Sequence, residues 1–190
     1  MAFTDFEATN WSVADPITAL LINELEKRAM GARATCKVYR SSDPGTQTGG
    51  APYIVDWEAE NWDNDTMWTA GGDSDLVTIQ QSGVYLINAT VATTGNASGN
   101  NTYLSIELGS SAATLGSGEV LGFYVGEQGT AAPIQVFNQV SAVANLSTAD
   151  EITLKVVADT NFDIDVEVYG DNGDGCWMSL VMIGRTPTLS

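Results

Sequence analysis

The chain has 190 residues, of which 44% are hydrophobic, and this length fits one ordinary domain with a core and a short appendage. It carries seven Lys and Arg residues against 24 Asp and Glu residues and no histidine, for a formal net charge of −17. A field of this sign repels phosphate backbones and anionic lipid, so the composition argues against binding to nucleic acid or to a membrane surface.

The sequence pattern shows no membrane-spanning segment, no secretory signal and no cysteine framework. No apolar run approaches the ~18 residues that a membrane-spanning helix needs. The first five residues lack the basic-then-apolar layout of a secretory signal. Two cysteines, Cys36 and Cys176, are too few for a disulfide-rich scaffold or a four-ligand zinc site.

The charge is divided unevenly along the chain. Residues 1–40 carry five basic and five acidic groups, whereas residues 41–190 carry Lys155 and Arg185 against 19 carboxylates. Such asymmetry is typical of segments with different surroundings or partners. We therefore predict an N-terminal segment over residues 1–34, for anchoring or oligomerisation, and a domain over residues 35–190.

The N-terminal segment is predicted to form an extended arm and a helix. Asp15 is a good N-cap and Pro16 suits the first helical position, because proline loses no hydrogen bond there. Apolar residues follow at helical spacing until Gly31. A helix of about 14 residues is marginal alone in water, so its apolar side must be buried against a partner. The predicted anchoring residues, including the aromatic arm, are Phe3, Phe6, Trp11, Ile17, Leu21 and Leu25.

From residue 35 onward the hydrophobic period changes from helical to alternating. Runs of β-branched and aromatic residues are separated by turns rich in Gly, Asn, Asp and Ser, without an intervening helical pattern. The predicted strands are 35–39, 53–58, 76–79, 84–93, 102–108, 120–125, 134–143, 151–158, 164–169 and 177–183. About ten short strands predict an all-β sandwich or jelly roll.

Several of these segments, taken in order, resemble the globular head of complement and tumour necrosis factor-like proteins. They are residues 55–63 (VDWEAENWD), 76–79 (LVTI), 83–87 (GVYLI), 146–154 (LSTADEITL) and 176–183 (CWMSLVMI). The likeness covers residues 35–184, and Ala149 stands where that family usually has glycine. The resemblance implies a ten-stranded jelly roll that assembles as a homotrimer.

The N-terminal segment has a second resemblance. Its residues Trp11, Asp15-Pro16-Ile17-Thr18-Ala19 and Asn23-Glu24-Leu25-Glu26 are similar to segments that open many tailed-bacteriophage virion proteins. This resemblance implies a place on a virion. No collagen-like Gly-X-Y stem precedes the β domain, which disfavours a secreted protein of the complement type.

The residue types that most catalytic sites require are largely absent. Without histidine there is no Ser-His-Asp or Cys-His arrangement, and no phosphate-binding glycine loop occurs. Carboxylates alternate along two segments, and we predict that each set points to a solvated face rather than forming an acid/base pair. These carboxylates are Asp56, Glu58 and Glu60, and Asp163, Asp165 and Glu167. We therefore predict a protein that is not an enzyme and needs no cofactor.

Three other features leave alternatives open. Asp171 and Asp174 lie in an oxygen-rich stretch that is interpreted as a tight turn, with calcium binding as the alternative. In the resembled fold the strands that carry Cys36 and Cys176 are neighbours, so a disulfide is conceivable, but two buried thiols are expected. The aromatic residues Trp57, Trp62 and Trp68 are expected in the core or a subunit interface, with stacking on a sugar as the alternative.

These features together favour a non-enzymatic virion protein. We expect a trimeric capsid decoration or head-fibre protein on the outer surface of the particle, with residues 1–34 bound to the major capsid protein or another virion protein. The alternative is a tail-fibre or baseplate protein that recognises a host-surface glycan. A secreted ligand of the complement or tumour necrosis factor type is a third, less favoured interpretation.

Overall fold

The computed structural model describes residues 34–71, 74–94, 101–109, 116–127, 135–166 and 175–184. The chain divides into two units, Met1–Ala32 and Arg33–Ser190, and all the described residues belong to the second. The predicted N-terminal arm and helix, with all six anchoring residues, lie outside the described residues. Asp171, Asp174 and Glu167 lie outside them as well.

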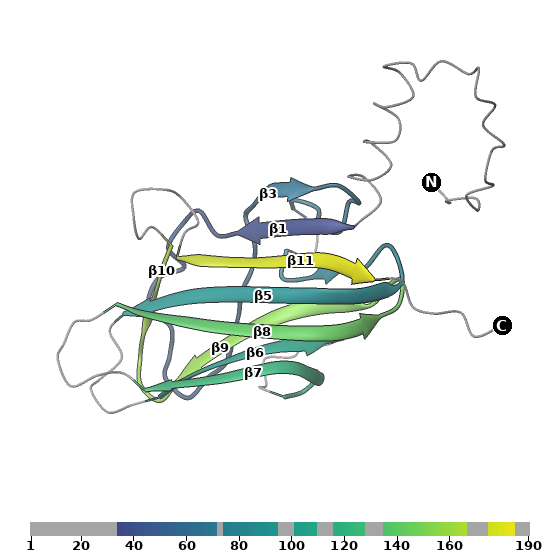
Figure 1. The fold of residues 1–190 in the computed structure, drawn as a ribbon. Coiled ribbons are helices and arrows are strands. Elements are labelled where there is room, and N and C mark those ends of the chain that lie inside the picture. The colour runs from purple at the N-terminus through teal and green to yellow at the C-terminus, as the bar shows by residue number, and fades with distance from the viewer. Residues whose placement is uncertain are drawn as a thin grey trace, which may run out of the picture. The chain divides into compact units, whose positions relative to one another are not determined.

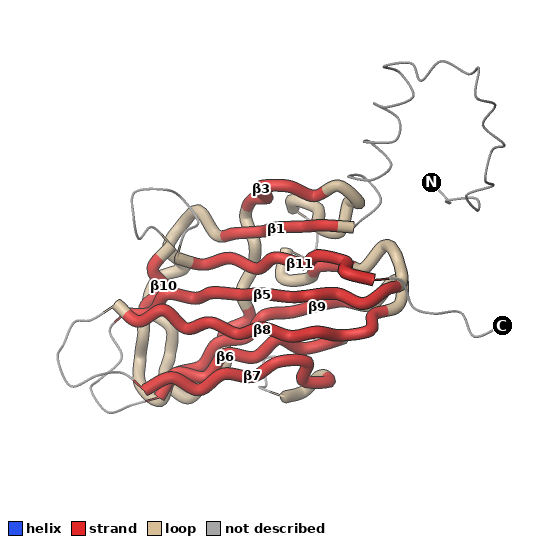
Figure 2. Tube along the Cα trace, viewed as in Figure 1, coloured by secondary structure: helices blue, strands red, loops and turns tan. Residues whose placement is uncertain are grey.

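Strands and connecting turns make up the whole described part of the chain (Figures 1 and 2). The strands are β1 (Thr35–Tyr39), β2 (Tyr53–Ile54), β3 (Ala59–Asp63), β4 (Val77–Thr78), β5 (Gly83–Thr94), β6 (Asn101–Leu108), β7 (Glu119–Glu127), β8 (Val136–Leu146), β9 (Glu151–Ala158), β10 (Asp163–Asp165) and β11 (Cys176–Gly184). No helix long and apolar enough to cross a membrane occurs in this part. The predicted all-β class is confirmed.

The strands form two antiparallel sheets. In sheet 1 the order is β3–β1–β11–β5–β8, and β10 also pairs with one end of β5 (Figure 1). In sheet 2 the order is β2–β9–β6–β7, and β4 also pairs with β9. Neighbours within each sheet are mostly far apart in sequence, so each sheet is held by long-range pairings.

The core lies between the two sheets, where alternate side chains from each strand meet. On β5 the inward residues Tyr85, Ile87 and Ala89 are buried, and on β9 so are Ile152 and Leu154. This alternation follows from strand geometry, in which successive side chains point to opposite faces. The two edge strands β7 and β8 approach closely, since a Cβ at Gly122 would lie 3.1 Å from Ser141 O.

The predicted strands 53–58 and 76–79 are shorter in the structure, the second covering only Val77–Thr78, and one strand is new. The predicted run 53–58 is a strand only at Tyr53–Ile54, because the following residues leave sheet 2 toward Arg40. Sequence analysis did not predict β3, whose residues Ala-Glu-Asn-Trp-Asp show no apolar alternation. An edge strand of this kind is held by backbone pairing with β1 rather than by a buried face.

Both cysteines are free and buried, as expected, although their strands are neighbours. Cys36 lies opposite Leu180 on β11, whereas the carbonyl of Cys176 accepts a 3.0 Å hydrogen bond from Arg40 N. Four residues of strand separate the two positions, about 14 Å at ~3.4 Å per residue, well beyond the ~7 Å between Cα atoms that a disulfide allows. Burial raises the pKa of both thiols, that of Cys176 to about 12.

The turn into β9 holds Ala149 in a left-handed backbone conformation, with φ at 72°. Its N–H donates to Ile79 O at 2.8 Å, and the next amide, Asp150 N, donates to Ser147 O at 3.1 Å. Glycine adopts such a φ without steric cost. The turn geometry thus explains why a glycine suits this position in the family that the sequence resembles.

Candidate functional site

Most of the outer side of sheet 1, which is turned away from the core, is almost free of charge; beyond it, the row of Phe137 and Ala92 ends on Asp165 of β10. Strand register places its residues in three cross-strand rows. The rows are Val143–Leu86–Val181–Thr35, Ser141–Asn88–Ser179–Lys37–Trp62 and Gln139–Thr90–Trp177–Tyr39. We call these thirteen residues the outer face. Lys37 is its one charged residue, and no carboxylate lies on it, although the chain carries 24.

Large exposed hydrophobic side chains in the described residues fall into two groups. Four lie on the outer side of sheet 1: Trp62, Phe137, Val143 and Ile183. The other three lie on the edge strand β7 and are called the β7 stripe: Val120, Phe123 and Val125. Val143 is 63% exposed and Phe123 is 51% exposed. Groups of exposed apolar side chains are uncommon on monomeric proteins and often mark interaction surfaces.

The β7 stripe lies on the side of sheet 2 that faces away from the core. Its residues stand opposite Glu107, Ser105 and Tyr103 of β6, and the rings of Tyr103 and Phe123 lie 6.3 Å apart. Exposed carboxylates bound the strand at both ends, Glu119 and Glu127. β7 pairs only with β6, so its other edge is free of strand partners in the described residues.

Lys37 is held on the outer face by two indole rings. Its Nζ lies 5.5 Å from the ring centre of Trp62 on β3 and 5.0 Å from that of Trp177 on β11. Both distances fall within the ~6 Å over which a cation is attracted to an aromatic face. The register explains the cluster, since Lys37 pairs directly with Trp62 and lies diagonal to Trp177.

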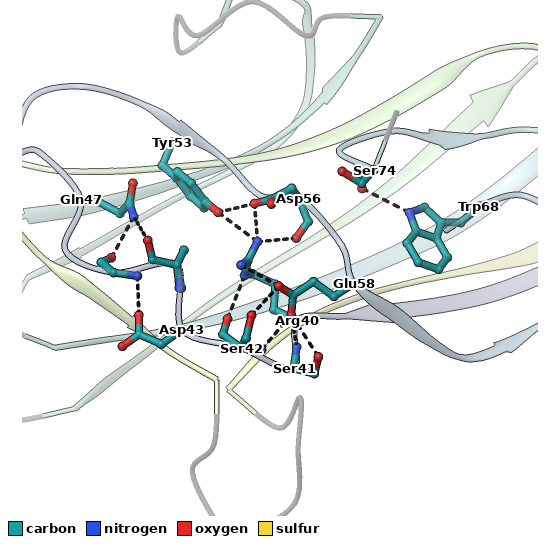
Figure 3. A network of polar contacts seen from close by, with 12 residues as sticks. Arg40, Ser41, Ser42, Asp43, Gln47, Tyr53, Asp56, Glu58, Trp68 and Ser74 are labelled. Atoms are coloured by element: carbon teal, nitrogen blue, oxygen red, sulfur yellow. Dashed lines mark hydrogen bonds and ion pairs between the residues drawn. The ribbon is translucent and has the colours of Figure 1, made fainter. Parts of the chain in front are cut away.

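A second polar site surrounds the buried side chain of Arg40, just after β1 (Figure 3). Its guanidinium donates to both the backbone and the side chain of Asp56, to Tyr53 Oη at 3.1 Å and to Glu58 Oε1 at 3.1 Å. Nε donates to Ser42 O at 3.2 Å. Each of the three guanidinium nitrogens therefore has an acceptor from its own chain, and the group offers little to an external anion.

The carboxylates of this site are ionised more readily than usual. Burial opposes the charge of Asp56, but hydrogen bonds from Tyr53 and Arg40 outweigh it and lower the pKa of Asp56. Burial likewise opposes the charge of Glu58, and hydrogen bonds from Ser42 and Ser41 lower its pKa. Asp56 and Glu58 do reach solvent, with side chains that are 48% and 29% exposed, but both also bind Arg40, which the sequence did not predict. Asp165 also has a partner, Gln135 Nε2.

An open hollow of about 570 Å³ lies beside Arg40. Its walls are mostly polar and include Gln47, Tyr53, Asp56 and Asp75. No group of three or more His, Cys, Asp or Glu side chains in the described residues is placed to hold a metal ion. The arrangement joins β1 to the segment before β3, and we interpret it as structural.

The third polar site is an ion pair without solvent exposure. Lys155 Nζ on β9 donates to Glu107 Oε2 on β6 at 2.8 Å and to Ser117 Oγ at 2.7 Å. Gly116 N and Gly118 N donate to the same carboxylate at 2.6 and 3.1 Å. Burial opposes the charge of Glu107, but these donors lower its pKa.

The three predicted tryptophans are separated by the fold. Trp57 and Trp68 are buried in the core, and the indole N–H of Trp68 donates to Ser74 O at 3.2 Å. Trp62 is 48% exposed and belongs to the outer face. Sequence reasoning did not identify Lys37, Trp177, the β7 stripe or the Glu107–Lys155 pair. One signal was available, because Lys155 is one of only two basic residues after position 40 and lies within an apolar strand.

Comparison with known proteins shows likeness in structure alone. No known protein family and no curated protein matches the sequence. Among solved structures, Eiger TNF from S. frugiperda superposes with a TM-score of 0.56 at 14% identity, covering 83% of this chain and 97% of that one. Murine APRIL gives 0.55 at 16% identity, covering 80% and 99%. The globular domain of zebrafish complement 1qA protein gives 0.53 at 12% identity, covering 80% and 99%.

These identities show the fold and nothing further. The body of the chain is a jelly-roll sandwich of the kind found in tumour necrosis factor-like and complement globular-head proteins. That part of the sequence prediction is confirmed. The similarity of residues 1–34 to phage virion proteins stays a prediction.

Proposed function

We propose that this chain is a non-enzymatic structural protein that self-associates as a homotrimer. We further propose that residues 1–34 tether the trimer to the outer surface of a tailed-bacteriophage virion, as a decoration or head-fibre protein. The observation that carries the proposal is the outer face of sheet 1, which has no carboxylate in a chain of net charge −17.

A face without carboxylates reduces the electrostatic repulsion between copies of this chain. Copies that each carry −17 repel one another, and the repulsion is strongest where carboxylates meet at short distance. Association through a face without carboxylates keeps the negative groups at the periphery, where solvent screens them. Burial of Val143, Leu86 and Val181 then contributes on the order of 25 cal/mol per Å² of apolar area.

The two groups of exposed apolar side chains are also compatible with a closed ring of copies of the chain. A ring of three requires two different surfaces on each copy, one meeting the other on the neighbour. The outer face and the β7 stripe are two such surfaces, on different sheets. The number three comes from the fold resemblance, and the two surfaces support it.

A virion location is supported by the N-terminal segment. Residues 1–34 carry three basic and five acidic groups, a net charge of only −2, while residues 35–190 carry the remaining −15. Binding of three apolar segments per trimer to the major capsid protein or another virion protein would gain from avidity, because the second and third bind in effect intramolecularly.

Light scattering on the purified chain tests the self-association. We expect about three times 20.1 kDa. The variants Val143→Asp and Phe123→Asp should shift the chain toward monomer, whereas Thr69→Asp, which adds the same charge at an exposed loop, should not. A wild-type chain that stays monomeric at micromolar concentration would contradict the proposal.

Truncation tests the tether. A chain starting at Thr35 should remain a soluble β-rich trimer and fail to bind particles that lack this protein, while Trp11→Ala and Leu21→Asp should weaken binding. Immunogold labelling of intact particles then distinguishes capsid from tail. Decoration by the truncated chain would place the anchor in the jelly roll instead.

A glycan-binding role at a tail tip is the second candidate, favoured by the half-exposed ring of Trp62. A glycan array with wild type and Trp62→Ala tests it. Binding that is lost in the variant while the trimer persists would support this role.

A further inference from the structure

Three basic residues lie in the described part of the chain, and they are used differently. Arg40 and Lys155 are buried, and each is ion-paired with a carboxylate of its own chain. Lys37 is the exception, since it forms no ion pair with any carboxylate of the described residues. It is also the one charge on the outer face of sheet 1.

The position of this cation is held by the fold. Trp62 and Trp177 come from the strands on either side of β1, so the ammonium group is flanked from both sides at 5.5 and 5.0 Å. Two flanking rings restrict the rotamers of a side chain that otherwise moves freely, and they leave its N–H donors available to an oxygen acceptor. Lys37 is thus a preorganised cation within an uncharged surface.

Charge complementarity indicates that a second copy of this chain binds to the outer face beside Lys37. The β7 stripe presents apolar side chains bounded by the exposed carboxylates Glu119 and Glu127. The outer face presents one mostly apolar row, Val143–Leu86–Val181–Thr35, and one cation in the row beside it. The two surfaces are complementary both in apolar character and in sign of charge.

We propose that Lys37 binds the carboxylate at one end of β7, Glu119 or Glu127, of a second copy, and so sets the register in which copies meet. This inference rests on the proposed self-association and adds its specificity-determining residue. A charge pair enclosed by apolar contacts discriminates against shifted registers, because these would leave the cation or the carboxylate unpaired.

Sedimentation equilibrium of the full chain tests the proposal through charge reversal. Lys37→Glu should raise the concentration of half-dissociation at least tenfold, and Lys37→Met should raise it less, since it removes the attraction without adding repulsion. Combining Lys37→Glu with Glu119→Lys or with Glu127→Lys should restore association to within about threefold of wild type in one of the two pairs. Thr69→Glu is the control for Lys37→Met, since each lowers the net charge by one, and far-UV circular dichroism checks the fold of each variant.

The possible outcomes distinguish the role of Lys37 from the proposed self-association on which it rests. Dissociation by Phe123→Asp with no effect of Lys37→Glu would overturn the role of Lys37 and leave self-association standing; Lys37 would then be available to an external anion. Restoration by neither double variant would overturn the pairing with β7. A wild-type chain that is monomeric would overturn both proposals.

Discussion

Lys155 Nζ lies 2.8 Å from Glu107 Oε2, and neither side chain is exposed to solvent. The pair joins β9 to β6, and the carboxylate also accepts hydrogen bonds from Ser105 Oγ and from the backbone after residue 115. A charge enclosed in this way is stable only while its partner is present.

Removal of one residue of this ion pair should therefore lower the stability of the fold. We expect Lys155→Met to lower the free energy of unfolding by about 3–5 kcal/mol, since it leaves a buried carboxylate without its cation. The double variant Lys155→Met/Glu107→Leu should lose less than the single variant. Urea denaturation at fixed protein concentration measures both. A double variant less stable than Lys155→Met would contradict the expectation.

Stability should fall in acid. The pKa values of Asp56, Glu58 and Glu107 are lower in the folded chain than the ordinary values of about 3.9 and 4.3. Their stabilisation is complete above those ordinary values, and it is lost as the pH falls through the lower values of the folded state.

The denaturation midpoint measured from pH 7 down to pH 2 checks this. The denaturation midpoint should begin to fall near pH 5. It should fall less steeply in Arg40→Gln, because Asp56 and Glu58 lose a shared hydrogen-bond donor there. Glu107 keeps Lys155 in that variant, so part of the pH dependence should remain. Equal slopes in wild type and variant would mean that the Arg40 site does not contribute.

Ala149→Gly should stabilise the chain. Ala149 has φ at 72°, a conformation that costs an L-residue roughly 1–2 kcal/mol and glycine little. The greater freedom of glycine in the unfolded chain offsets ~0.4–1 kcal/mol of this, so the net gain should lie between about 0 and 1.6 kcal/mol. Thermal denaturation measures it, with Ala144→Gly in the extended strand β8 as a control that should destabilise.

Two neighbouring glycines should respond differently to alanine. A Cβ at Gly49 would overlap the backbone of Thr160 and lie 2.8 Å from Asn161 N, while a Cβ at Gly50 meets nothing within 4 Å. Gly50→Ala should cost about 1 kcal/mol because its φ is 74°. Gly49→Ala should cost clearly more, since backbone must shift, and equal melting temperatures of the two variants would contradict this.

Cations should stabilise the assembly. Association of copies that each carry −17 is opposed by repulsion until the charges are screened. The melting temperature should rise between low and moderate ionic strength, or with millimolar Mg²⁺ or Ca²⁺. An uncharged osmolyte is the control, and no dependence on salt would mean that the carboxylates are well separated or already neutralised.

The sequence by itself determined the all-β class and most of the strands. Alternation over residues 35–39, 84–93, 102–108 and 151–158 predicted β1, β5, β6 and β9 closely, because one buried face per strand imposes a period of two. It also determined that the negative charge lies beyond residue 40. It did not predict β3, which has no apolar alternation to detect.

Only the tertiary structure decided which strands are neighbours, and with them every candidate site. Alternation shows which side chains share a face of one strand, but the pairing of strands distant in sequence depends on the whole fold. Glu107 and Lys155 are 48 positions apart, and Lys37 meets Trp177 across two paired strands. The carboxylate-free outer face exists because β1, β11, β5 and β8 lie side by side, which brings together neutral residues that are scattered along the sequence.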